Sequence, residues 1–82
     1  MKYREYTVTA VNQGIKLAKG NEEKTVKVVD CTEFRYKLAK NKIYAAGGPY
    51  ALVDWMERNI DLFECNIRKI IEYAWYEMKG VR

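Results

Sequence analysis

The stretch EFRYKLAKNKIYAAGG, residues 33–48, places four cations among aromatic side chains. Lysine and arginine contact phosphate oxygens in nucleic-acid complexes, and tyrosine beside arginine is typical of protein interfaces. The chemistry that this composition suggests is binding of an anion or of a partner surface. The four cations are Arg35, Lys37, Lys40 and Lys42.

The chain offers little for bond-making chemistry, because its 82 residues include no histidine and no serine. These absences exclude Ser-His and Cys-His nucleophilic pairs and histidine general-base catalysis. Cys31 and Cys65 are the only thiols, and two cysteines without histidine do not complete a structural zinc site. We therefore predict a non-enzymatic protein without metal or cofactor, and with both cysteines reduced, since nothing else indicates secretion.

Composition predicts one globular domain over residues 1–82, with 49% hydrophobic and 32% charged residues and a net charge of +4. The charge is uneven: residues 1–47 carry ten Lys/Arg against five Asp/Glu, whereas residues 48–82 carry five against six. Such asymmetry favours an anionic partner on the first half. The chain shows neither an apolar run of membrane-spanning length nor a signal peptide, which predicts a cytoplasmic protein.

Alternating β-favouring residues predict short antiparallel strands throughout the first half, separated by turns that contain glycine or asparagine. The last two predicted strands form a hairpin within the opening stretch, joined by the polar residues 40–42. The predicted strands cover residues 3–11, 15–19, 24–30, 34–39 and 43–46.

The second half predicts two amphipathic helices, residues 49–59 and 62–79. Pro49 suits the first turn of a helix, and Asp61 and Glu64 have the spacing of a capping box. The fold class is therefore α+β: an antiparallel sheet of four to five strands over residues 3–46, followed by two helices packed on one face. The predicted apolar stripes are Leu52, Val53, Met56 and Ile60 in the first helix, and Phe63, Ile67, Ile70, Ile71, Ala74 and Met78 in the second.

A basic sheet face is one candidate site. If residues 34–39 form a strand, Arg35 and Lys37 point away from the helices, in the same phase as Lys16 and Lys27. This face either binds anions or is only solvated. Base stacking needs aromatic side chains on this face, and only Tyr3 and Tyr44 have a phase that could place them there. The candidate residues for anion or nucleic-acid binding are Lys16, Lys27, Arg35, Lys37, Lys40 and Lys42.

The far side of the helix at 62–79 is the other candidate, because Leu62, Cys65, Lys69, Tyr73 and Tyr76 recur there at three- and four-residue steps. Aromatic side chains beside a cation suit an interface. Alternatively, the preceding helix or the chain termini cover this face. The candidate partner-binding residues are Trp55, Lys69, Tyr73, Trp75 and Tyr76.

The leading hypothesis is a small non-catalytic binding module that occupies the surface of a protein partner or of a second copy of the chain. A phage or mobile-element inhibitor of nucleic-acid machinery, such as a defence nuclease, is one such module, although no residue here indicates that origin. The alternative is direct binding of nucleic acid or an anionic nucleotide through the basic sheet face. A small enzyme that uses only tyrosine, lysine or carboxylates is the third hypothesis.

Overall fold

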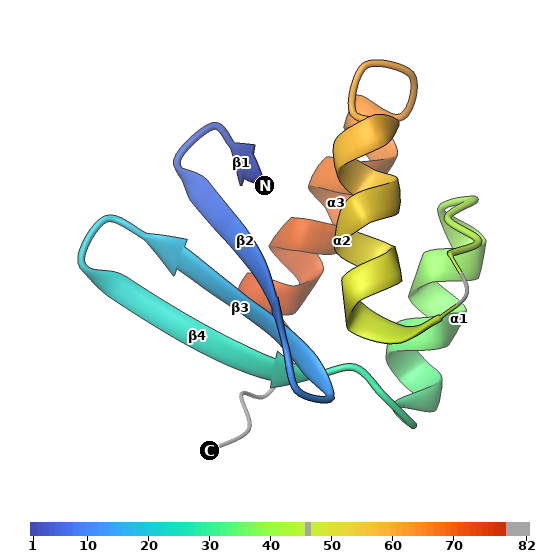
Figure 1. Ribbon diagram of the computed structural model, residues 1–82, viewed down its shortest axis with the longest axis horizontal. Coiled ribbons are helices and arrows are strands. Elements are labelled where there is room, and N and C mark those ends of the chain that lie inside the picture. Colours follow the sequence, from blue (N-terminus) through green and yellow to red (C-terminus); the bar gives the residue numbers. More distant parts are fainter. Residues whose placement is uncertain (46, 79–82) are drawn as a thin grey trace.

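The computed structural model describes residues 1–45 and 47–78, and within them it contains a four-stranded antiparallel sheet followed by helices (Figure 1). This arrangement confirms the α+β class and the sheet of four strands, although three helices follow it, not the two predicted. The strands are β1 (Lys2–Tyr3), β2 (Tyr6–Val11), β3 (Gly14–Lys19) and β4 (Glu22–Lys27); the helices are α1 (Thr32–Lys40), α2 (Gly48–Arg58) and α3 (Glu64–Tyr76).

The sheet is a simple meander in the order β1-β2-β3-β4. Val11 pairs with Gly14 and Lys19 with Glu22, so both main hairpins have two-residue turns. Gln13 and Gly20 have positive φ angles of 66° and 61°, which suit such tight turns. Because the second turn uses only residues 20–21, β4 begins two residues earlier than predicted.

Side chains alternate along β2 as the sequence predicts. Tyr6 and Val8 are buried, whereas Thr7 and Thr9 are exposed. On β3, Ile15 and Leu17 are buried in the same way and Lys16 faces outward. The inner face of the sheet is therefore apolar, and it needs helices to cover it.

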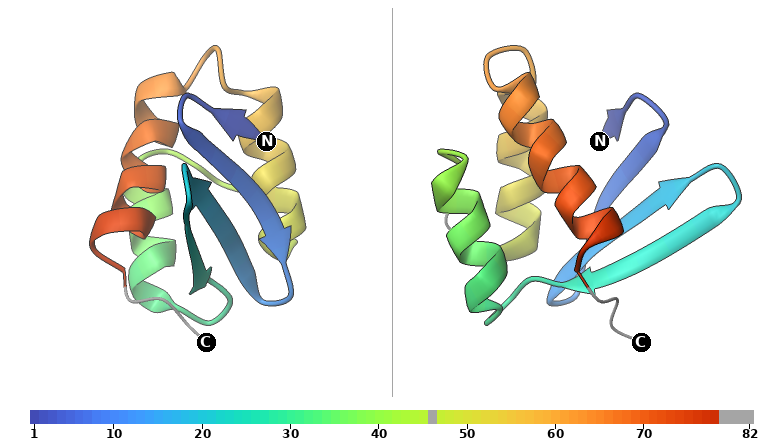
Figure 2. Two further views of the ribbon diagram at one scale, coloured as in Figure 1. Left: turned by 90° about the vertical axis from the view of Figure 1, so that its left-hand side faces the viewer. Right: turned by 180° about the vertical axis from the view of Figure 1, so that it is seen from behind.

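Helices α2 and α3 provide that cover, since both lie on the same face of the sheet (Figure 2). The predicted stripes are confirmed at most positions: Leu52, Val53 and Met56 of α2 are buried, and so are the α3 residues Ile67, Ile70, Ile71 and Ala74. Helix α3 begins at Glu64 and not at residue 62, and Leu62 is exposed in the preceding turn. The predicted end at residue 79 lies outside the described residues.

The predicted hairpin at 34–46 is wrong, because residues 32–40 form helix α1. Phe34 and Leu38 are four residues apart, so they share a face in a helix as well as in a strand. The residue between them, Tyr36, is exposed and does not belong to the core that a strand would have required. Glu33 in the first turn and Lys40 in the last turn suit the helix dipole.

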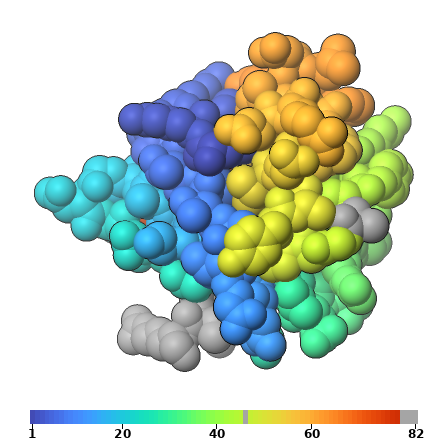
Figure 3. All heavy atoms as spheres, in the orientation of Figure 1, coloured from blue at the N-terminus to red at the C-terminus, as the bar shows by residue number. Residues whose placement is uncertain are grey.

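Helix α1 forms a third layer beyond α2 and α3. The space-filling view places α2 between the strands of the sheet and α1 (Figure 3). Phe34 of α1 is fully buried, and its ring stacks on Tyr73 of α3 with 6.3 Å between centroids. After the helix, Lys42 adopts a positive φ angle of 62°, and the chain turns so that Ile43 returns to the core. Helix α1 therefore covers the side of α3 that the sequence left open.

Among the described residues, no helix has both the length and the apolar character needed to cross a bilayer.

Candidate functional site

Helix α1 separates the cations that the sequence placed on one sheet face. Arg35, Lys37 and Lys40 lie on the helix and Lys42 lies just after it, while Lys16 and Lys27 remain on the outer face of the sheet. The expectation that Arg35 and Lys37 share a surface with the two sheet lysines is therefore wrong. The reason is the helical conformation of residues 32–40, which moves these side chains to a different layer.

A groove of about 560 Å³ runs between α1 and α3. It joins residues from both candidate sets: the cations Lys37 and Lys40 from one, and Lys69, Tyr73 and Tyr76 from the other. Two distant segments of the chain thus form a single cationic and aromatic site. The residues that line the α1–α3 groove are Lys37, Lys40, Asn41, Lys69, Glu72, Tyr73, Tyr76 and Glu77.

The three lysines of this groove have no ion-pair partner within 4.0 Å among residues 1–45 and 47–78. The ion pairs in this part of the chain lie elsewhere, and one of them, between Lys16 and Glu23, involves a sheet lysine. Glu72 and Glu77 line the groove without reaching the lysines at that distance. The lysine ammonium groups are therefore available to an added anion.

Tyr73 forms the buried wall of the groove, so the alternative that another part of the chain covers this side of α3 applies to it, although the cover is α1 and not the preceding helix or the termini. Its side chain is only 6% exposed, because α1 covers it. The hydroxyl donates a 2.6 Å hydrogen bond to Glu33 Oε1, and Lys37 Nζ lies 4.9 Å from the ring centroid. Burial, followed by the hydrogen bond to Glu33, raises the pKa of Tyr73 well above its ordinary value of 10.0. Tyr73 thus stays neutral and positions Lys37.

Tyr76 lies at the exposed end of the groove, and a residue that the sequence analysis missed holds it there. Lys19 Nζ donates a 2.9 Å hydrogen bond to the Tyr76 hydroxyl, and this bond lowers the pKa of the phenol. The same ammonium lies 5.0–5.3 Å from the ring centroids of Tyr6, Trp75 and Tyr76. Lys19 was missed because its phase on β3 places it on the inner face, at the edge of the core. The sequence signal that could have identified Lys19 is a lysine near the end of a strand at a position that alternates with the buried residues.

Two further tyrosines stand beside the cations of α1. Tyr36 is 64% exposed and Tyr44 is 73% exposed, and the Tyr44 hydroxyl bonds at 3.5 Å to the carbonyl oxygen of Ala39 in the last turn of α1. The predicted strand at residues 34–39, which does not form, would have placed Tyr36 in the core. We call the exposed residues Arg35, Tyr36, Lys40, Lys42 and Tyr44 the α1 surface.

The two tryptophans of the predicted partner set lie outside the groove lining. Trp55 packs on Phe63 with ring centroids 5.5 Å apart, and Trp75 makes an edge-on contact with Tyr6 at 5.9 Å. Both are half-buried. Both pack against the core, and of that set only Lys69 and Tyr76 are exposed at the groove.

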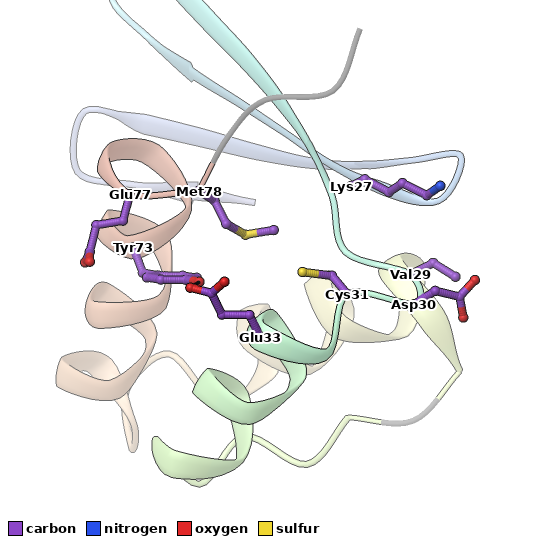
Figure 4. Close-up of a pocket in the computed structure, with 8 residues that line it drawn as sticks. All are labelled: Lys27, Val29, Asp30, Cys31, Glu33, Tyr73, Glu77 and Met78. Carbon is purple, nitrogen blue, oxygen red and sulfur yellow. Dashed lines mark hydrogen bonds between the residues drawn. The ribbon is translucent and has the colours of Figure 1, made fainter.

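A second pocket, of about 500 Å³, lies where β4 leads into α1. Figure 4 shows the Cys31 sulfur and Met78 at this pocket, and Glu33 in contact with the Tyr73 hydroxyl. Cys31 and Cys65 are free thiols. Within the described residues, no group of three His, Cys, Asp or Glu side chains is placed to hold a metal ion. This pocket thus offers an isolated thiol beside carboxylates, which is not a recognisable catalytic arrangement.

Comparisons with protein-family models, curated proteins and solved structures give no match for this chain.

Proposed function

We propose that this protein is a non-catalytic binding module that attaches to a polyanionic partner through the α1 surface and the α1–α3 groove. The observation that carries the proposal is the convergence of Lys37, Lys40 and Lys69 on one groove without ion-pair partners among the described residues. An added anion gains attraction there without first breaking a salt bridge. Such a module acts by occupancy, because it excludes whatever else would bind the same anionic surface.

The exposed tyrosines support the same assignment. Tyrosine supplies a large, rigid contact area at a low entropic cost, and it is enriched at interfaces. Tyr36 and Tyr44 lie beside Lys40 and Lys42 without being needed by the core. The outer sheet face offers Lys16 and Lys27 with threonines but no exposed tyrosine, so it supports binding less well.

Elution from a heparin column tests the proposal, with two variants of equal net charge. One carries Lys37→Gln, Lys40→Gln and Lys69→Gln; the other carries Lys2→Gln, Lys16→Gln and Lys27→Gln, so each falls from +4 to +1. We expect the wild type and the second variant to elute at similar salt, and the groove variant to elute much earlier. If both variants elute at salt concentrations lowered by the same amount, only net charge determines binding. Passage of the wild type through the column without retention at about 50 mM salt would refute polyanion binding.

A further inference from the structure

We infer that the anion is a single-stranded nucleic acid, with its phosphates in the α1–α3 groove and its bases stacked on Tyr36 and Tyr44. This inference rests on the proposed function and deepens it. It differs from the sheet-face binding that the sequence suggested, because the site lies on the opposite side of the molecule from the outer sheet face. On helix α1, Tyr36 and Lys40 are four residues apart and therefore share a face, and the Tyr44 hydroxyl bonds to the carbonyl oxygen of Ala39 in the last turn.

The sugar-phosphate backbone of a single-stranded nucleic acid matches the α1–α3 groove in charge and size. Lys37 and Lys40 extend from α1 and Lys69 from α3, so cations line both sides of a space of about 560 Å³. Pockets of about 300–1,000 Å³ hold small ligands, and a single nucleotide falls in that class of ligand. Lysine is a flexible point charge that suits phosphate without fixing a base. The groove therefore predicts contact with the backbone and little sequence preference.

The bases would stack on aromatic side chains that lie outside the groove. Tyr36 and Tyr44 are the exposed rings adjacent to Lys40 and Lys42 along the chain. Stacking on aromatic side chains tolerates any base, because every base presents a π face. A duplex keeps its bases paired and stacked, so it would use the lysines but not these rings. Poly-L-glutamate, which has no aromatic or apolar side chain, would likewise gain from the lysines alone.

Glu72 and Glu77 are the two carboxylates of the groove, and they oppose the binding of a phosphate there. Both carboxylates line the groove, and neither forms an ion pair with a groove lysine within the described residues. A phosphate beside Lys37 or Lys69 would feel repulsion from Glu72. The variant Glu72→Gln should therefore bind an oligonucleotide several-fold more tightly, which loss-of-function variants cannot mimic.

The experiment measures the anisotropy of fluorescein-labelled oligothymidine with the full chain, at about 50 mM and about 200 mM salt. Parallel samples contain a duplex of equal length and poly-L-glutamate. We expect the single strand to bind most tightly. The double variant Tyr36→Leu/Tyr44→Leu should bind the single strand at least tenfold more weakly than the wild type, and it should bind polyglutamate with unchanged affinity. The matched control is Tyr50→Leu, since Tyr50 is 66% exposed on α2 and does not line the groove.

The salt dependence identifies the phosphate contacts. For single strands each neutralised phosphate contributes about 0.7 to the slope of log affinity against log salt. The triple variant Lys37→Gln/Lys40→Gln/Lys69→Gln should lower that slope by about 2, whereas the triple variant of Lys2, Lys16 and Lys27 should leave it unchanged. Photocrosslinking of wild-type protein to bromodeoxyuridine-substituted oligonucleotide should place the adduct within residues 32–45, even if a variant fails to fold.

Two results would overturn the inference in different ways. If polyglutamate binds as tightly as oligothymidine and the tyrosine variants change neither, the groove binds an acidic protein, and the proposed function stands without this inference. If none of the polyanions binds at about 50 mM salt, the proposed function fails as well. Crosslinking to the outer sheet face would refute the placement on α1.

Discussion

The ammonium group of Lys24 on β4 donates a 2.6 Å hydrogen bond to the main-chain carbonyl oxygen of Trp75, near the end of α3. The last carbonyl groups of a helix lack partners within it, and they carry the negative end of its dipole. Lys24 therefore ties the end of α3 to the middle of the outermost long strand. It can do so because its phase on β4 is that of the inner face.

Replacement of Lys24 by methionine removes this bond while keeping most of the aliphatic chain. We expect Lys24→Met to lower the free energy of unfolding by about 1–2 kcal/mol, as for loss of a charged hydrogen bond at a helix end. Lys27→Met, on the exposed face of the same strand, should change it by less than about 0.5 kcal/mol. Urea denaturation measures both. Similar losses in the two variants would show that Lys24 does not stabilise the end of α3.

Gly14 should tolerate no side chain. A Cβ atom at this position would lie 2.1 Å from the carbonyl oxygen of Val26, on the neighbouring strand β4. We expect Gly14→Ala to destabilise the protein by about 2–3 kcal/mol or more, because the strands must separate to admit the methyl group. Gly20→Ala is the comparison. Its Cβ meets nothing within 4 Å, so its cost is only that of a left-handed backbone, about 1 kcal/mol.

The loss of unfolding free energy in each variant can be measured from the midpoint of its urea denaturation curve, with the same dependence of that free energy on urea concentration in both. A Gly14→Ala variant as stable as Gly20→Ala would contradict the close approach of β3 and β4 at this point.

Stability should fall on the alkaline side through Tyr73. Its pKa is raised in the folded protein by burial and by the hydrogen bond to Glu33, whereas in the unfolded chain it ionises near 10.0. Below that pH both states hold the proton, and the full stability is present. As pH rises beyond it, the unfolded state loses the proton first, so the free energy of unfolding declines.

Tyr73→Phe should therefore give a shallower decline between about pH 9 and about pH 11, measured by urea denaturation at each pH. Tyr3 and Tyr6, whose pKa values are also raised, mainly by burial, and Lys19, whose pKa is raised by its hydrogen bond to Tyr76, contribute to the slope that remains. The lowered pKa of Tyr76 acts in the opposite direction. A Tyr73→Phe variant with the wild-type slope would show that this phenol titrates normally.

The two thiols should react at different rates with an aromatic disulfide reagent. Cys65 is exposed, whereas Cys31 is half-buried at the start of α1. We expect one fast and one slow thiol in the native protein, and two fast thiols in denaturant without reductant. Cys65→Ala should remove the fast phase alone. A single thiol equivalent, or none, in the denatured chain would instead mean that the cysteines are blocked or bridged.

Much of the fold could be predicted because most of its sequence patterns are compatible with only one type of secondary structure. The alternation at Tyr6, Thr7 and Val8 suits a half-buried strand and not a helix, and the stripe from Ile67 to Ala74 suits a helix and not a strand. The segment at 32–40 has no such unique period. Its choice of a helix depends on contacts remote in sequence, such as the stacking of Phe34 on Tyr73.

The candidate site was predicted in its residue types but not in its geometry. Lys37 and Lys69 were both identified as cations of interest, in two different sites. They share a groove only because α1 packs on α3, and no local pattern specifies that packing. Tyr36 was not predicted as a site residue for the same reason. The segment that contains it was predicted as a strand, which would have placed Tyr36 in the core, but this segment forms a helix.

The meander also bears on the order in which the chain assembles. In the sheet, the most distant residues paired between β2 and β3 are Tyr6 and Lys19, and between β3 and β4 they are Gly14 and Lys27. Closing such short loops costs little entropy, whereas the contact of Tyr6 with Trp75 requires nearly the whole chain to be present. During synthesis, the hairpins can therefore form while α3 is still inside the ribosome, and their uncovered apolar face must wait for the last helix before the protein is protected from aggregation.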